Sequence, residues 1–151
     1  MELKLNLKGT YKLNITEGDK KTTLIIPNLI TTIGKGMVAS ILTDSVDAGM
    51  FQYFSFGDSN TTPAIGNTKL SSEVGRLEVL TKSAFGSQIT LTGFVPSDEL
   101  VGFTLQEIGL FGINAGATLD SGLIFSRALI SPTITKTSVM EISISYVLTI
   151  S

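Results

Sequence analysis

The last part of the chain, residues 139–150, constrains the fold more than any other segment. Large apolar side chains occupy every second position, and most positions between them are polar. The apolar set is Met140, Ile142, Ile144, Tyr146, Leu148 and Ile150. A slip of one residue in strand pairing would expose this whole set to water, so the register is strongly specified. The segment therefore predicts a long strand with one face on a core.

The first 26 residues show the same period of two. Apolar and polar residues alternate over 3–7 and again over 11–15, on either side of Gly9-Thr10. This pattern predicts a β-hairpin with its turn at Gly9-Thr10, and a further strand over 22–26. Residues 1–26 would form a small sheet, or an arm that docks on the sheet edge of a neighbour.

Several short apolar runs between these ends are separated by turn residues. Strands are predicted over 77–83, 88–95, 100–111 and 123–130, with a loop over 113–122 and a turn at Ser131-Pro132. Short strands at this spacing are typical of an antiparallel β-sandwich. At 151 residues the chain has the length of one domain, 1–151, with one core.

One segment changes to a helical period. From residue 28 to about 43, apolar residues recur three and four positions apart, which predicts one amphipathic helix packed on the sandwich. Asn28 is the predicted N-cap. Gly34 and Gly36 each cost about 1 kcal/mol relative to alanine inside a helix, so they either permit close packing on the sheet or mark a break.

The composition excludes several classes of functional site and binding partner. The chain has no cysteine and no histidine, which excludes disulfides, zinc bound by thiolate or imidazole, and catalytic triads with a histidine base. Charged residues make up 16% of the chain and the net charge is -2, so nucleic acid and anionic membranes are not expected partners. No apolar run approaches the ~20 residues that span a bilayer, and no signal-peptide pattern opens the chain. We expect a soluble intracellular product without a cofactor.

The aromatic run at 51–56 predicts a strand that is buried on both faces, because large side chains occupy successive positions. Gly57-Asp58 ends this run, and a polar loop follows. Glu73 and Arg76 are three residues apart, which would place both charges on one side of a helical turn. A surface pair of this kind is worth under ~1 kcal/mol, and here it would act as a local clasp that closes the loop.

Glu107 lies in the apolar segment LQEIGLFG. A lone buried carboxylate costs several kcal/mol, so Glu107 needs a cation, and Arg76 and Arg127 are the natural partners. A perturbed buried carboxylate can also be catalytic, but the sequence shows no second acid, base or nucleophile arranged with it. We therefore favour a structural ion pair. A glycan-cleaving site that uses Asp98 and Glu99 stays open as an alternative, as does a carbohydrate-binding surface.

Several segments in a fixed order are similar to those of a known protein family. They are YFSFGDSNTTP followed by LSSEVGR, then LQEIGLF, then a strand that holds Arg127, then Lys136 after a proline turn and the alternating last strand. Residues 51–151 thereby resemble the attachment domain at the start of tail-collar fibre proteins of tailed bacteriophages, and also small capsid decoration proteins. The resemblance implies that Glu73, Arg76, Glu107 and Arg127 form a framework of ion pairs, with no catalytic, cofactor or metal residues.

The resemblance also implies a non-enzymatic virion protein that is assembled in the host cytoplasm. The sequence departs from fibre proteins because no repetitive shaft or receptor-binding tip follows, so we expect a capsid decoration protein that binds the major capsid protein on the outside of the shell. The alternative is a tail-fibre, neck or baseplate adaptor that binds another virion protein. In both cases we expect a homo-oligomer, with a trimer as one candidate, and residues 1–26 as a docking arm.

Overall fold

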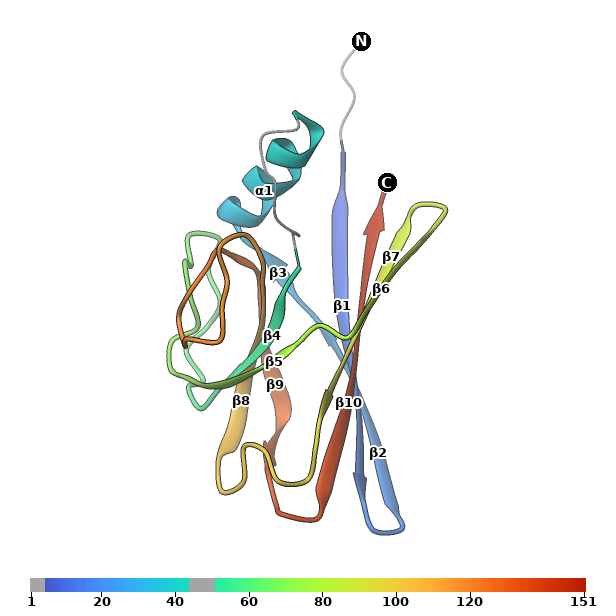
Figure 1. The fold of residues 1–151 in the computed structure, drawn as a ribbon, viewed down its shortest axis with the longest axis vertical. Coiled ribbons are helices and arrows are strands. Elements are labelled where there is room, and N and C mark those ends of the chain that lie inside the picture. The colour runs from blue at the N-terminus through green and yellow to red at the C-terminus, as the bar shows by residue number, and fades with distance from the viewer. Residues whose placement is uncertain (1–4, 44–50) are drawn as a thin grey trace.

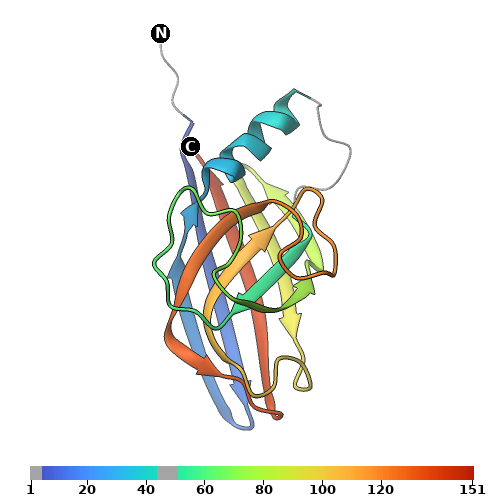
Figure 2. The ribbon, with the colours of Figure 1, turned by 90° about the vertical axis from the view of Figure 1, so that its left-hand side faces the viewer.

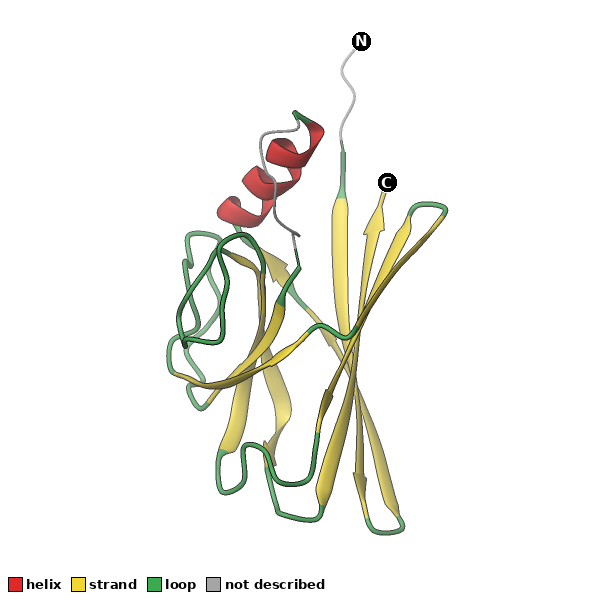
Figure 3. Cartoon of the chain, in the orientation of Figure 1, coloured by secondary structure: helices red, strands yellow, loops and turns green. Residues whose placement is uncertain are grey.

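The chain forms an antiparallel β-sandwich with one short helix, which confirms the predicted fold class (Figures 1 and 3). The computed structural model describes residues 5–43 and 51–151. Two five-stranded sheets pack face to face, and the helix lies at one end of the sandwich (Figure 1).

The first sheet, sheet A, has the strand order β2-β1-β10-β7-β6. Its strands are β1 (Leu7–Glu17), β2 (Lys20–Pro27), β6 (Thr81–Phe85), β7 (Gln88–Val95) and β10 (Met140–Ile150). β10 is the predicted last strand, and it lies at the centre of the sheet with Ile142, Ile144, Tyr146 and Leu148 of its apolar set buried in the core. β1 pairs with β10 along its whole length, from Leu7 opposite Ile150 to Glu17 opposite Met140.

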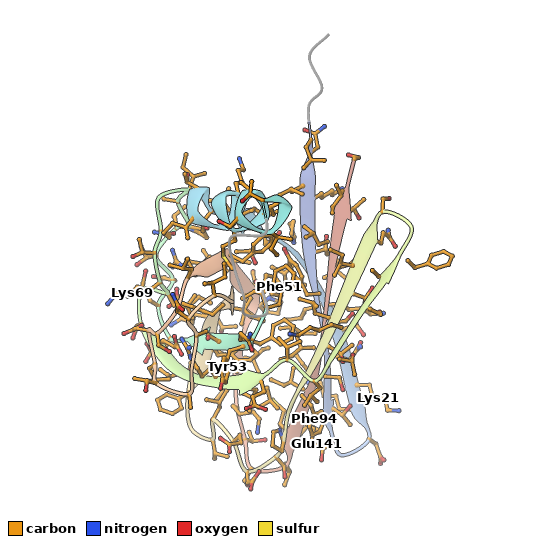
Figure 4. All side chains as sticks on the ribbon, turned by 45° about the horizontal axis from the view of Figure 1, so that its top comes forward. Lys21, Phe51, Tyr53, Lys69, Phe94 and Glu141 are labelled. Carbon is orange, nitrogen blue, oxygen red and sulfur yellow. The ribbon has the colours of Figure 1, made fainter. Side chains whose placement is uncertain are left out.

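The second sheet, sheet B, has the strand order β3-β9-β8-β4-β5. Its strands are β3 (Leu29–Ile30), β4 (Tyr53–Gly57), β5 (Glu73–Glu78), β8 (Thr104–Phe111) and β9 (Ile124–Thr135). β4 lies between β5 and β8, and Phe54, Ser55 and Phe56 are all fully buried, so the prediction of a strand covered on both faces is confirmed. Just before this strand, Phe51 lies in the interior, where its ring meets that of Phe125 edge-on at 5.0 Å between centroids (Figure 4).

The helix α1 (Thr32–Leu42) starts later than the predicted residue 28. Leu29–Ile30 pair with β9 as a short strand, and this pairing takes the backbone that would have formed the first helical turn. Thr31, not Asn28, is the N-cap: its Oγ1 accepts a hydrogen bond from Gly34 N at 2.8 Å and donates one to Ile124 O at 2.8 Å. The helix start is therefore determined by contact with β9 rather than by local preference.

The predicted hairpin turn at Gly9-Thr10 is wrong, because β1 runs straight through both residues. A side-chain Cβ on Gly9 would collide with the hydroxyl of Tyr146 on the paired strand, so the glycine serves close packing and not a turn. The actual turn between β1 and β2 contains Gly18, whose φ is +58°. Residues 1–4 of the predicted arm lie outside the described residues.

Two other predicted boundaries are also wrong. The predicted strand 77–83 is divided in two, because the chain leaves sheet B after Glu78 and enters sheet A at Thr81. Ser131-Pro132 lies inside β9 and not in a turn between strands. There the register with β8 shifts, since Ile134 lies opposite Leu105 whereas Leu129 lies opposite Glu107. The proline occupies this irregular stretch, where a missing backbone N–H costs no ladder bond.

The two helix glycines give a matched test of the packing. A Cβ at Gly34 would clash with the backbone carbonyl of Phe125, whereas a Cβ at Gly36 meets nothing within 4 Å. We predict that Gly36→Ala raises the free energy of unfolding by up to about 1 kcal/mol through helix propensity. Gly34→Ala should lower it despite the same gain in propensity. Urea denaturation of both variants measures this, and a stabilised Gly34→Ala would contradict the packing argument.

Candidate functional site

A buried ion pair joins the neighbouring strands β8 and β9. Arg127 Nη2 lies 2.6 Å from Glu107 Oε2, and Arg127 Nε lies 3.0 Å from the same oxygen. Both side chains are at most 1% exposed. Of the two arginines expected as partners of Glu107, the structure places Arg127 beside it. The carboxylate also fills the space that a Cβ on Gly57 would need, so the glycine in β4 makes room for it.

This ion pair holds the loop 58–72, which connects β4 to β5. The guanidinium of Arg127 donates to Thr61 O at 2.6 Å and to Asn67 Oδ1 at 3.0 Å. Glu107 accepts from the backbone N–H groups of Ser71 at 3.2 Å and Ser72 at 2.8 Å. The loop therefore finds, in two buried side chains, partners for backbone groups that have none in a sheet.

The second ion pair, between Glu73 and Arg76, differs from its prediction in two ways. It lies in the strand β5 and not on a helical turn, and its side chains are at most 2% exposed, so it is not a surface pair. A β-bulge brings the two charges together: Gly75 lies opposite Phe56 and Glu73 opposite Gly57, which leaves Val74 as an extra residue. The pair is bidentate, with both N···O distances at 2.7 Å.

Arg76 and Glu73 hold the loop 112–123, which connects β8 to β9. Arg76 Nη1 donates to Gly116 O at 2.9 Å and to Ser121 O at 3.1 Å, and Glu73 Oε1 accepts from Asp120 N at 3.1 Å. The guanidinium also lies over the ring of Phe111, 4.6 Å from its centroid, a cation–π contact that favours the buried charge. Figure 2 shows this loop in orange and the loop 58–72 in green, both in front of sheet B.

Lys136 is a third buried cation, at the other end of the sandwich. The residue is 1% exposed, and its Nζ donates to Ser97 O and Thr137 O, each at 3.0 Å. It thereby fastens the connection between β7 and β8, which contains the exposed Asp98 and Glu99. Burial lowers the pKa of Lys136, and the nearby carboxylates of Asp98, Glu141 and Glu99 oppose this shift.

A cluster of polar groups that sequence reasoning missed lies between the sheets. Tyr11 OH shares a hydrogen bond with Ser126 Oγ, and Asn28 Nδ2 donates one to Tyr146 OH at 2.8 Å. The ring centroids of Tyr11 and Tyr146 are 4.7 Å apart. Burial raises the pKa of Tyr146 to about 12 and that of Tyr11 well above 10. The phenols are therefore neutral hydrogen-bonding groups at physiological pH. Asn28, which was the predicted N-cap, therefore binds Tyr146 in this cluster and does not cap the helix.

The four charged residues predicted as a framework thus form two separate pairs, each occupied by its partner and by loop backbone. In this arrangement their chemistry is hydrogen bonding and charge neutralisation. Within residues 5–43 and 51–151, no group of three or more acidic, histidine or cysteine side chains is placed to hold a metal ion. No helix in the same described residues is long and apolar enough to cross a membrane.

No protein family, no curated protein and no solved structure matches this chain.

The buried pair of Glu107 and Arg127 should carry much of the stability. We predict that Glu107→Gln lowers the free energy of unfolding by about 3–5 kcal/mol, because it leaves Arg127 buried without a counter-charge. The matched control is Asp120→Asn, which removes the exposed pair of Asp120 with Lys69 and should cost under ~1 kcal/mol. Urea denaturation measures both, and equal effects would contradict the assigned role.

The tyrosine cluster predicts a loss of stability in alkali. Because the folded state keeps Tyr146 protonated up to about pH 12, the unfolded state releases this proton first, near pH 10, and stability falls between those values. Each such phenol contributes up to about 1.4 kcal/mol per pH unit to the fall. We expect a shallower fall for Tyr146→Phe when the free energy of unfolding is measured from pH 9 to 12. If the free energy of unfolding fell equally steeply in the wild-type protein and in Tyr146→Phe, the prediction would be contradicted, because the two proteins have the same ionisable groups apart from Tyr146.

Proposed function

We propose that this chain is a non-enzymatic structural protein of a tailed-bacteriophage particle, and that it decorates the outside of the capsid by binding the major capsid protein. One observation supports this most. Most of the segments that carry the resemblance to phage virion proteins become β4, β5, β8 and β9, which are neighbours in sheet B, and the alternating last segment becomes β10 at the centre of sheet A. Both buried ion pairs, Glu73 with Arg76 and Glu107 with Arg127, lie within these four strands. Four of the resembling strands thus lie side by side in one sheet.

The two held loops supply a surface suited to docking on a shell. A loop that is ordered before binding loses less conformational entropy on association, so affinity is gained without new contacts. The exposed side chains of these loops are mostly uncharged, and they include Ile65 and Leu119. Apolar anchors on an ordered, uncharged surface suit an interface in which a few contacts supply the energy and a symmetric shell repeats them many times.

A tail-fibre, neck or baseplate adaptor is the second candidate. The resemblance favours it, because the attachment domain of tail-collar fibre proteins is itself a tail component. The same ordered loop surface would then bind another virion protein in place of the capsid. The two candidates differ in copy number, since a shell offers hundreds of equivalent sites and a tail tip only a few.

The copy number in purified particles tests the proposal. We predict that quantitative mass spectrometry finds this chain at a level comparable to the major capsid protein. About a dozen copies per particle would contradict decoration and support the adaptor. Absence from particles would overturn both virion roles and favour the glycan-directed alternatives, among them the one that uses Asp98 and Glu99.

A further inference from the structure

One aromatic side chain projects from the sandwich without any cover. Phe85 ends the edge strand β6 at the tip of the β6–β7 hairpin, and its side chain is 91% exposed, more than any other large apolar side chain in the described part of the chain. The turn that follows contains Gly86 with φ of +58°, so the hairpin reverses tightly and leaves the ring at its end. A phenyl ring in this position can enter a hollow of its own size.

A hollow of suitable chemistry lies between the two sheets. Its volume is about 180 Å³. The apolar half of its lining comes from Ile15, Leu24, Pro132, Ile134 and Met140, and the polar half comes from Glu17, Lys20, Thr22, Thr133 and Thr135. Leu24 and Ile134 belong to the main core, and Ile15 and Met140 pack against it, so the hollow is an unfilled continuation of the core. It opens where β9 departs from regular pairing with β8.

The size of the hollow fits an aromatic ring. A cavity of roughly 150 Å³ with aliphatic walls is known to accept benzene in another protein. A phenylalanine ring has the dimensions of benzene, and burying it from water stabilises a contact by about 1.5–3 kcal/mol.

The tip and the hollow lie at opposite ends of the same sheet. Pairing places Phe85 opposite Gln88, and Gln88 opposite Thr149, at one end of β10, whereas Met140 begins β10 at the other end. Nine residues of strand separate the two ends, which corresponds to ~30 Å. Figure 1 shows the β6–β7 hairpin and the start of β10 at opposite ends of the long axis. Phe85 therefore cannot fill the hollow of its own chain.

We propose that Phe85 of one copy inserts into this hollow of a second copy. The two surfaces differ, so the contact is heterologous: repeated copies form a closed ring or an open filament, according to the angle between them. Pairing between copies through the edges of sheet A is disfavoured, because its edge strands carry Lys20 and Lys21 in β2 and Lys82 in β6. The contact goes beyond the proposed virion role and does not depend on it.

One ring buries far less than the ~800 Å² per partner of a stable interface. The association is therefore weak in solution, and it becomes effective when several contacts act together. The test must detect a weak complex between identical chains. The absence of cysteine helps, because Ser87→Cys beside the tip provides one unique site for a nitroxide spin label.

The experiment mixes this spin-labelled chain with ¹⁵N-labelled chain without a spin label. We expect broadening of the amide signals of Leu24, Ile134 and Met140, and loss of that broadening when the labelled chain also carries Phe85→Ser. The control is Leu80→Ser, an exposed apolar residue before the same strand, which should leave the broadening unchanged.

A second pair of variants tests the hollow itself. Thr22 lines the hollow, and the adjacent Thr23 lies on the opposite face of the same strand. Thr22→Phe in the ¹⁵N-labelled chain should fill the hollow and abolish the broadening, whereas Thr23→Phe should not. Absence of broadening around the hollow, or broadening that survives Phe85→Ser, would overturn the proposal. Because the isolated protein is used, this failure is distinct from a wrong copy number in particles.

Discussion

The loops of this sandwich depend on buried cations that donate hydrogen bonds to loop carbonyls. Arg127, Arg76 and Lys136 each lie in or beside a strand, and each reaches a different connection between strands. A charge is costly in the interior, but carbonyl oxygens and carboxylates together satisfy its N–H groups. The buried cations and the loops therefore depend on each other. The loop carbonyl oxygens satisfy the N–H groups of the cation, and the cation provides hydrogen bonds that the loop backbone would otherwise form in a sheet.

This division of labour gives the molecule two independent surfaces. Buried ion pairs organise the loops over sheet B, whereas the exposed aromatic tip lies at one end of sheet A and the hollow lies between the two sheets at the opposite end. Binding to a shell through the loops and contact between copies through the ends would therefore not compete.

The sequence predicts what depends on local periodicity and misses what depends on distant partners. Alternation alone identifies β10, and the aromatic run identifies β4 as buried on both faces. The need of Glu107 for a cation also follows from its apolar neighbours. In contrast, the helix start at Thr31 depends on β9, and the place of the predicted Glu73–Arg76 pair in a strand, with both side chains buried, depends on a bulge opposite β4. The burial of Lys136 could have been predicted from one feature of the sequence, because alternation along a strand places Lys136 on the same side as the apolar Ile134.

The antiparallel ladder between β1 and β10 also determines how the protein resists force. Asn6 and Ser151 are joined by two backbone hydrogen bonds at one end of this ladder. Tension applied between these two residues would peel the ladder open, one rung after another. Tension between the hairpin tip and the hollow would instead run along the strands and load the ladder between β7 and β10 in shear. A chain of copies held through their ends would therefore be pulled in its mechanically strong direction.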